Sequence, residues 1–345
     1  MKDIKVLGID LAKNVFQLHG TDTSGKVVLR KRLSRTKLIE FMSNLAPCLV
    51  GIEACGSAHY WARTFNSMGH SAKMMAPQFV KPYIKSNKND MRDAEGINEA
   101  VTRPTMRFVP IKTIEQQDIL LLHRARELAV KQRTAQANQI RGLLAEYGVI
   151  IAKGLSHLQE LPTLLEFSVK EQKISDKGKN IFLNLYDQLK AYEEQVNYYE
   201  KEIEQNAKED SRCVEIQKID GIGPISASAV VATIGDPNVF KNGREVAAWL
   251  GLVPKQHSSG NKVVLGSISK RGDRYVRKLL VHGGRAAVKT CENKTDKRNL
   301  WLADKKHRIG FNKAAVALAN KNARTIWAIL KTGECYRQPE QVQGV

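Results

Sequence analysis

The chain has 345 residues and a mass of 38.6 kDa, enough for two domains with a sizeable core. Its 55 Lys and Arg residues against 35 Asp and Glu give a net charge of +20, and 42% hydrophobic content excludes a disordered basic tail. It has neither a membrane-length apolar run nor a signal-peptide core, and its five cysteines lack CxxC spacing. We therefore expect a folded, reduced, cytoplasmic protein with a polyanionic partner and no membrane partner.

The first hundred residues alternate strand and helix patterns. Residues 5–20 and 26–33 are expected to form two strands of a hairpin, joined by a turn at 21–25. Helices are then expected at 36–45, 57–68 and 89–101, alternating with strands at 48–53 and 72–75. This order predicts a mixed sheet covered by helices.

Four carboxylates in this region are candidates for metal binding. Asp10 lies inside the otherwise apolar first strand and Glu53 ends a second apolar strand, where an unneutralised charge costs several kcal/mol. Asp90 and Asp93 are three residues apart at a helix start and share one face. Taken singly, each acid is better explained without a function: Asp10 as a turn or edge residue, and Asp93 as a helix cap. Together they would suit one or two Mg²⁺ ions, which serve phosphodiester chemistry.

The middle of the chain is dominated by helix formers. Helices are expected over 115–147 and from 181 to about 206. In the second helix, apolar and aromatic residues recur at steps of four and three: Ile181, Leu185, Leu189, Tyr192, Val196, Tyr199 and Ile203. This seam predicts either an antiparallel hairpin or a contact between subunits.

The positive charge is concentrated in the last third of the chain. Residues 1–240 hold 33 basic and 28 acidic residues, whereas residues 241–345 hold 22 and 7. The turn at Gly221 and Gly223 is consistent with either a phosphate-binding helix-hairpin-helix element or a simple helix cap. Further candidate contacts to a nucleic-acid backbone are Lys262, Lys270, Arg271, Arg274, Arg277 and Lys278.

Three motifs resemble the DEDD transposases of bacterial insertion sequences. They are Gly-Ile-Asp-Leu-Ala-Lys at 8–13, Gly-Ile-Glu-Ala-Cys-Gly at 51–56 and Lys-Asn-Asp-Met-Arg-Asp-Ala at 88–94. The resemblance implies an α/β N-terminal domain of the RNase H-like (RuvC-like) class. It also implies that Asp10, Glu53, Asp90 and Asp93 form a DEDD metal site for Mg²⁺.

The C-terminal motifs resemble the transposase domain of the same family. Gly-Leu-Val-Pro at 251–254, a polar loop at 256–262 containing Ser-Ser-Gly, and Gly-Ser-Ile-Ser-Lys-Arg-Gly at 266–272 occur in that order. The family's serine nucleophile precedes a glycine and corresponds to Ser259, with Ser258 as the alternative register. The resemblance implies DNA as substrate, an element-encoded bridge RNA as guide, and a dimer that assembles into a tetrameric synapse.

These observations predict four regions. They are a RuvC-like catalytic domain (1–109), a helical coiled-coil or oligomerisation region (110–210), a mainly α transposase domain (211–332) and a tail (333–345). The leading hypothesis is an RNA-guided recombinase that forms a phosphoserine intermediate. The alternatives are a RuvC-like endonuclease that uses water as nucleophile and a non-catalytic nucleic-acid-binding scaffold.

Overall fold

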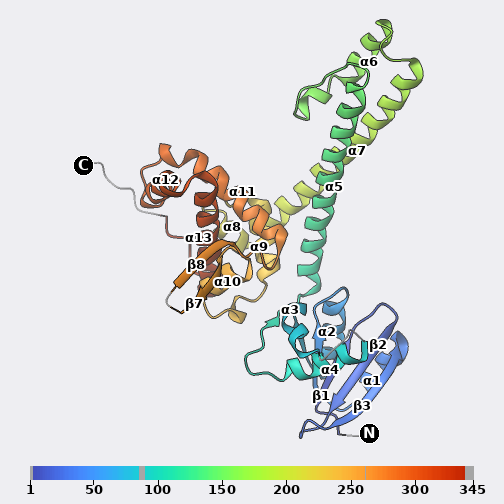
Figure 1. Ribbon diagram of the computed structural model, residues 1–345, viewed down its shortest axis with the longest axis vertical. Coiled ribbons are helices and arrows are strands. Elements are labelled where there is room, and N and C mark those ends of the chain that lie inside the picture. Colours follow the sequence, from blue (N-terminus) through green and yellow to red (C-terminus); the bar gives the residue numbers. More distant parts are fainter. Residues whose placement is uncertain (1–2, 85–89, 261, 339–345) are drawn as a thin grey trace. The chain divides into compact units, whose positions relative to one another are not determined.

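The computed structural model describes residues 3–84, 90–260 and 262–338, and the chain divides into two compact units, Met1–Thr113 and Ile114–Val345. The first unit contains a six-stranded mixed sheet of order β3-β2-β1-β4-β5-β6, of which Figure 1 labels β1, β2 and β3. β1 pairs antiparallel with β2 and parallel with β4. Its strands are β1 (Val6–Asp10), β2 (Val15–Thr21), β3 (Val27–Ser34), β4 (Leu49–Glu53), β5 (Ser71–Met75) and β6 (Phe108–Val109).

Helices pack against both faces of this sheet. The main core joins alternate residues of the strands to α1 and α2, with Trp61 and Phe65 of α2 fully buried. A smaller core on the other face includes Ile97 and Val101 of α4. The helices of this unit are α1 (Arg35–Ser43), α2 (Ala58–Ser67), α3 (Pro77–Val80) and α4 (Asp90–Val101), and a 3₁₀ turn spans Lys81–Tyr83.

The expected first strand over residues 5–20 is wrong. β1 ends at Asp10 and β2 begins at Val15, so the start of the sheet is a three-stranded antiparallel meander instead of one hairpin. Ala12, Lys13 and Asn14 between them are exposed. The apolar residues on either side concealed this short turn, because a run of strand-forming residues does not itself show where the chain reverses.

The second unit begins with two long helices, α5 (Ile114–Ala145) and α7 (Asp176–Glu209), which lie side by side (Figure 1). Arg126 pairs with Glu200 at 2.5 Å and Arg133 with Glu193 at 3.9 Å, so the helices run antiparallel. The predicted hairpin is therefore present within one chain. Four buried residues of α7 recur every seven positions, Phe182, Leu189, Val196 and Ile203, and Tyr186 is also buried, whereas Ile181 of the predicted seam is exposed.

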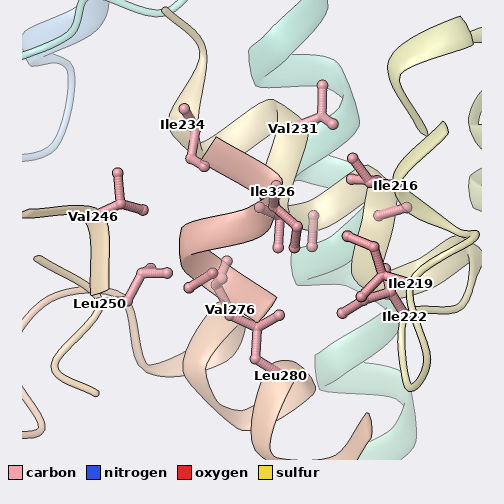
Figure 2. Close-up of a cluster of buried hydrophobic side chains, with 14 of the residues drawn as sticks. Ile216, Ile219, Ile222, Val231, Ile234, Val246, Leu250, Val276, Leu280 and Ile326 are labelled. Atoms are coloured by element: carbon pink, nitrogen blue, oxygen red, sulfur yellow. The ribbon is translucent and has the colours of Figure 1, made fainter. Parts of the chain in front are cut away.

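Most of the remaining elements of this unit are helical and pack around a second hydrophobic core, whereas the helix over Leu161–Lys170 packs against α5 and α7 in a separate cluster. Figure 2 shows this core, in which Ile216, Val231, Val246, Val276 and Ile326, each from a different helix, come together. The elements are α6 (Leu161–Lys170), α8 (Ser211–Ile216), α9 (Pro224–Ile234), α10 (Gly243–Trp249), β7 (Pro254–Ser259), β8 (Lys262–Ile268), α11 (Arg274–Thr290), α12 (Lys297–Ile309) and α13 (Phe311–Thr332), with 3₁₀ turns at Ser156–Leu158, Pro237–Val239 and Cys291–Asn293.

A buried histidine connects the long helices to this core. The two ring nitrogens of His123 on α5 lie 3.1 Å from the Tyr275 hydroxyl and 3.1 Å from Ser228 Oγ. Burial, assisted by the nearby positive charge of Arg126, lowers the pKa of His123 to about 4. The ring is therefore neutral at physiological pH and acts as a hydrogen-bonding tie between α5, α9 and α11. Within the described ranges, no helix is both long and apolar enough to cross a membrane.

Candidate functional site

Asp10 and Glu53 lie next to each other at the ends of two neighbouring parallel strands. The register pairs Ile9 of β1 with Ile52 of β4, and each acid follows directly. Since side chains alternate along a strand, both carboxylates lie on the face opposite Ile9 and Ile52, which is the face covered by α4. Both acids are partly exposed. The fold therefore brings together two acids that are 43 residues apart in the sequence.

The negative charges of Asp10 and Glu53 affect the pKa of the nearby Cys55 thiol. Burial raises the pKa of Cys55, and the charges of Glu53 and Asp10 raise it further. Both carboxylates are thus close enough to act on the same sulfur atom. A cation between them would relieve their mutual repulsion.

Two glycines allow α4 to lie directly on these strands. Gly8 and Gly51 face each other in the β1–β4 register. A Cβ atom at Gly8 would overlap the Ala94 carbonyl oxygen and lie 2.5 Å from the Asn98 nitrogen. One at Gly51 would lie 2.8 Å from Val101 Cβ. Only glycine at these two positions permits this approach without displacement of the helix.

Hydrogen bonds fix the direction of α4 over the sheet. The Asn98 amide donates to the carbonyl oxygens of Val6 and His19, both at 3.0 Å. Asn98 is therefore level with Val6, and Ala94 is level with Gly8. Four helical residues and two strand residues each advance the chain about 6 Å, so one further turn brings the start of α4 level with Asp10.

This geometry places the beginning of α4 beside the carboxylate pair. α4 begins at Asp90, whose side chain lies outside the described residues, and Asp93 follows in the first turn, partly buried. No three described His, Cys, Asp or Glu side chains form a complete metal-binding group. The available donors are carboxylate oxygens, which suit a hard divalent cation such as Mg²⁺.

Replacing Gly8 by Ala is expected to disturb both folding and activity. The added methyl group meets backbone atoms of α4, so either strand or helix must move. We expect the free energy of unfolding to fall by about 3 kcal/mol. A 1 Å displacement of the helix start would also slow the DNA cleavage that the sequence resemblance implies, by about 10²-fold. Urea unfolding and initial cleavage rates measure the two effects.

Gly56→Ala is the matched control for this substitution. A Cβ at Gly56 meets nothing within 4 Å, and the residue does not have a positive φ. Gly56 is the last residue of the second carboxylate motif, three residues after Glu53, so its substitution adds a methyl group close to the candidate site without a steric overlap. Wild-type stability and rate in Gly8→Ala would show that α4 does not depend on this close approach.

The candidate serines lie on a two-stranded hairpin in the second unit. The segment 256–262 is expected to be a loop, but its residues 256–259 belong to β7 and residue 262 begins β8, so that Ser258 is opposite Val263 and Ser259 is opposite Lys262. The expectation was wrong because the polar residues of β7 pair with the β-branched residues of β8. Ser258 is exposed, and its Oγ accepts a hydrogen bond of 2.9 Å from the Gln256 amide. The side chains of Ser259 and Lys262 lie outside the described residues.

Two close backbone approaches hold the base of this hairpin. Gly251 and Gly272 have φ values of +70° and +72°. A Cβ atom on Gly251 would lie 2.5 Å from the Arg271 nitrogen, and one on Gly272 would overlap the Trp249 carbonyl oxygen. The glycines of two motifs that are separate in sequence therefore pack together.

The predicted basic residues near the hairpin differ in their surroundings. Lys270, Arg271 and Arg274 are exposed. Arg277 donates to the carbonyl oxygens of Leu250 at 3.0 Å and Arg271 at 2.7 Å, so it helps to hold the base of the hairpin. Lys278 pairs with Glu127 at 2.5 Å. Intramolecular contacts thus occupy Arg277 and Lys278, and sequence spacing gave no indication of them.

The glycine turn before α9 also has a structural function. Gly221 has a φ of +82°, and a Cβ atom there would lie 2.5 Å from the Gly283 carbonyl oxygen of α11. Gly223 is exposed at the N-cap of α9, which begins at Pro224. The fold therefore explains Gly221 by packing and leaves Gly223 accessible for contact with a phosphate.

The acid that precedes this turn is held in place by a polar cluster. The Asp220 carboxylate accepts hydrogen bonds from Lys294 at 3.0 Å and Asn299 at 3.1 Å. Burial alone would raise the pKa of Asp220, but these two bonds and the charges of Lys294 and Arg298 outweigh it, so the pKa is below its ordinary value. Asp220 is therefore ionised and anchors the turn.

Comparison with known proteins finds transposases over almost the whole chain. The family model described as "Transposase IS116/IS110/IS902 family" matches residues 213–299, and a model of DEDD transposases of the IS110 group, described as "Transposase", matches residues 7–149. Asp10, Glu53, Asp90 and Asp93 fall in the second range, and Ser258 and Ser259 fall in the first.

Full-length relatives give the same result. A "Probable family 20 transposase" of Pseudomonas aeruginosa is 47% identical over 96% of this chain and 98% of its own length. A "Transposase for insertion sequence element IS1111A" of Coxiella burnetii is 47% identical over 98% of this chain and 92% of its own length. A "Transposase for insertion sequence element IS1328" of Yersinia enterocolitica is 36% identical over 97% of this chain and 99% of its own length.

Proposed function

This chain belongs to the IS116/IS110/IS902 transposase family, and from that membership we propose that it recombines DNA through a serine nucleophile, a Mg²⁺-binding DEDD site and an element-encoded guide RNA. Membership in a family of enzymes that cut and transfer DNA strands favours catalysis over the scaffold alternative. The observation that carries the proposal is the meeting of Asp10, Glu53 and the start of α4 at one end of the sheet.

The mixed sheet and its carboxylate edge support an RNase H-like catalytic domain over residues 1–109. Asp10, Glu53, Asp90 and Asp93 would hold one or two Mg²⁺ ions. When bound, the metal offsets negative charge on the phosphate and promotes ionisation of a hydroxyl group. The chain's own residues position the metal ligands. The β1–β4 register brings Asp10 and Glu53 together, and Gly8 and Gly51 leave space for α4, which would supply Asp90 and Asp93.

The serine step conserves the energy of the phosphodiester bond. Ser259 Oγ loses its proton and attacks phosphorus, and the bond from phosphorus to a deoxyribose oxygen breaks. That oxygen takes up a proton and leaves as a hydroxyl, while the serine holds the other DNA end as a phosphodiester. Attack by a second DNA hydroxyl then restores the serine and joins new strands, so no ATP is consumed. Ser258 is the alternative nucleophile.

The C-terminal charge supports the nucleic-acid part of the proposal. Residues 241–345 have a net charge of +15, and Lys270, Arg271 and Arg274 are exposed beside the serine hairpin. We assign backbone contacts to these residues and to Gly223 and Lys262. The transposase domain spans 211–332. The helical hairpin of 110–210 would assist assembly of dimers into a tetrameric synapse.

The proposal is tested with protein purified from cells that also carry the DNA flanking its gene. We expect a structured RNA to copurify, and we expect Mg²⁺ with this RNA to support joining of donor and target DNA. Joining is measured by amplification across the new junction, with EDTA and ribonuclease as separate controls. Joining that survives ribonuclease would exclude the RNA guide, and products with only free ends would indicate the water-dependent endonuclease.

A further inference from the structure

Strand β3 and the start of α1 form a strongly basic edge of the first unit. We call this set the basic edge: Arg30, Lys31, Arg32, Arg35 and Lys37, all exposed. The chain has no acidic residue between Asp22 and Glu40. Within the described part of the chain, none of the five forms an ion pair. β3 is also the last strand on this side of the sheet.

The strand pattern divides the basic edge between the two faces of the sheet. Leu33 packs into the core beneath α1 and α2, so Lys31 is on that face, where it lies over the Phe41 ring. Arg35 lies over the Trp61 ring. Along β3, Arg30 and Arg32 alternate with Lys31 and Leu33, so they lie on the opposite face of the sheet, which carries α4.

On the α4 face, the register aligns Arg32 with the candidate metal site. Arg32 pairs with Gln17, and Gln17 pairs with Asp10. Directly paired residues share a face, so these three side chains form a row that Glu53 continues on β4. With strands about 4.8 Å apart, the Arg32 backbone lies about 10 Å from that of Asp10.

The neighbouring row brings Arg30 to the same face. Arg30 pairs with His19, and His19 pairs with Gly8. This second row is covered near its centre by α4, because Asn98 bonds the His19 carbonyl oxygen and Ala94 touches Gly8. The Arg32 row lies at the start of α4 and is more open: Gln17 is partly exposed and Arg32 is exposed. An open polar row therefore leads from the sheet edge to the carboxylates.

Protection of an edge strand explains only part of this pattern. Charged side chains on an edge prevent pairing with other chains, and either sign of charge serves that purpose. Here five charges have one sign, and two of them lie on the catalytic face. Cations close together without carboxylate partners repel one another, and a polyanion would relieve this repulsion.

We propose that the basic edge binds the sugar–phosphate backbone of the substrate DNA strand that enters the carboxylate site, with Arg32 and Arg30 contacting phosphates and Gln17 between them and Asp10. This inference rests on the proposed function, because it takes the carboxylates to act on DNA. The residues position the strand and take no part in the chemical step. DNA is favoured over RNA because the row ends at the site that cleaves DNA.

The test uses the full-length protein with Arg30→Gln and Arg32→Gln together. Binding of a fluorescent 30-base-pair DNA is measured by anisotropy in EDTA at several salt concentrations. Loss of two phosphate contacts should reduce the slope of log K against log salt by about 2. In Mg²⁺, KM for DNA cleavage should rise at least about tenfold with kcat little changed, which a purely structural role would not produce.

Two variants control for folding and for total charge. Lys177→Gln with Lys201→Gln removes two exposed cations from α7 and should leave slope and KM unchanged. Arg30→Lys with Arg32→Lys keeps the charge and should retain most of the slope. Equal thermal midpoints exclude misfolding. If the glutamine variant keeps the wild-type slope, or loses affinity for an RNA oligonucleotide alone, the proposal is wrong.

The surface and the proposed function can fail separately. If the wild type does not cut DNA in Mg²⁺ but the glutamine variant shows a reduced slope of log K against log salt, the basic edge binds DNA and the catalytic assignment is wrong. Normal cleavage with an unchanged slope and KM in the glutamine variant would retain the catalytic assignment and reject the surface.

Discussion

Asp10→Asn is expected to abolish Mg²⁺-dependent DNA cleavage while leaving DNA bound. The substitution removes one negative charge from the pair formed with Glu53 and a ligand from the candidate metal site. Several kcal/mol of transition-state stabilisation would be lost, which corresponds to a rate at least about 10³-fold lower. Affinity for DNA in EDTA should be unchanged or higher, because a charge that repels phosphate is gone.

The comparison is with Glu53→Gln and with Asp3→Asn. Glu53→Gln should reproduce the loss, since its carboxylate lies beside Asp10 across the strand pair. Asp3 is an exposed acid of the same unit that pairs with Lys5, so its substitution should leave the cleavage rate unchanged. The measurements are initial rates on end-labelled DNA and binding by anisotropy. Wild-type rates in Asp10→Asn would show that this edge of the sheet is not catalytic.

Ser259→Ala is expected to eliminate the covalent protein–DNA adduct. Replacement removes the oxygen that would bond to phosphorus, so no labelled DNA should remain with the protein on a denaturing gel. Folding should persist, because Ser259 lies at the turn end of the hairpin, next to Gly260 and far from its base. DNA binding in EDTA should therefore match the wild type.

Ser258→Ala gives the sharpest control for this prediction. Ser258 is the preceding residue of the same strand, and its exposed hydroxyl is the alternative nucleophile. Ser258→Ala should retain the adduct and lose only the hydrogen bond from Gln256. The reverse result would move the nucleophile by one residue. Adducts in both single variants and in the double variant would exclude serine catalysis at this site.

The structure also changes the interpretation of the charge. When residues 1–240 are counted together, their net charge is only +5, which suggests that the first two-thirds of the chain are nearly neutral. Division at the boundary of the two units gives 18 basic and 9 acidic residues in 1–113, but 15 and 19 in 114–240. The first unit is therefore basic as well, and the acidic segment 114–240 concealed this. Four of the nine acids of this unit are the candidate metal ligands.

The sequence by itself determined the family, most of the helices and strands, the candidate acids and the concentration of charge. Each of these depends on residue identity or on spacing over a few turns, which a single stretch of chain contains. The same local reasoning failed at the turn after Asp10 and at the β7–β8 hairpin. In both places, strand pairing decided the structure.

Only the tertiary structure decided which residues meet. Asp10 and Glu53 become neighbours through the register of β1 and β4, and Arg32 joins their row through two further pairings. The start of α4 reaches the site because Gly8 and Gly51, 43 residues apart, leave space for the helix. Register and helix docking depend on contacts between distant segments, and a local pattern of polar and apolar residues contains no information about them.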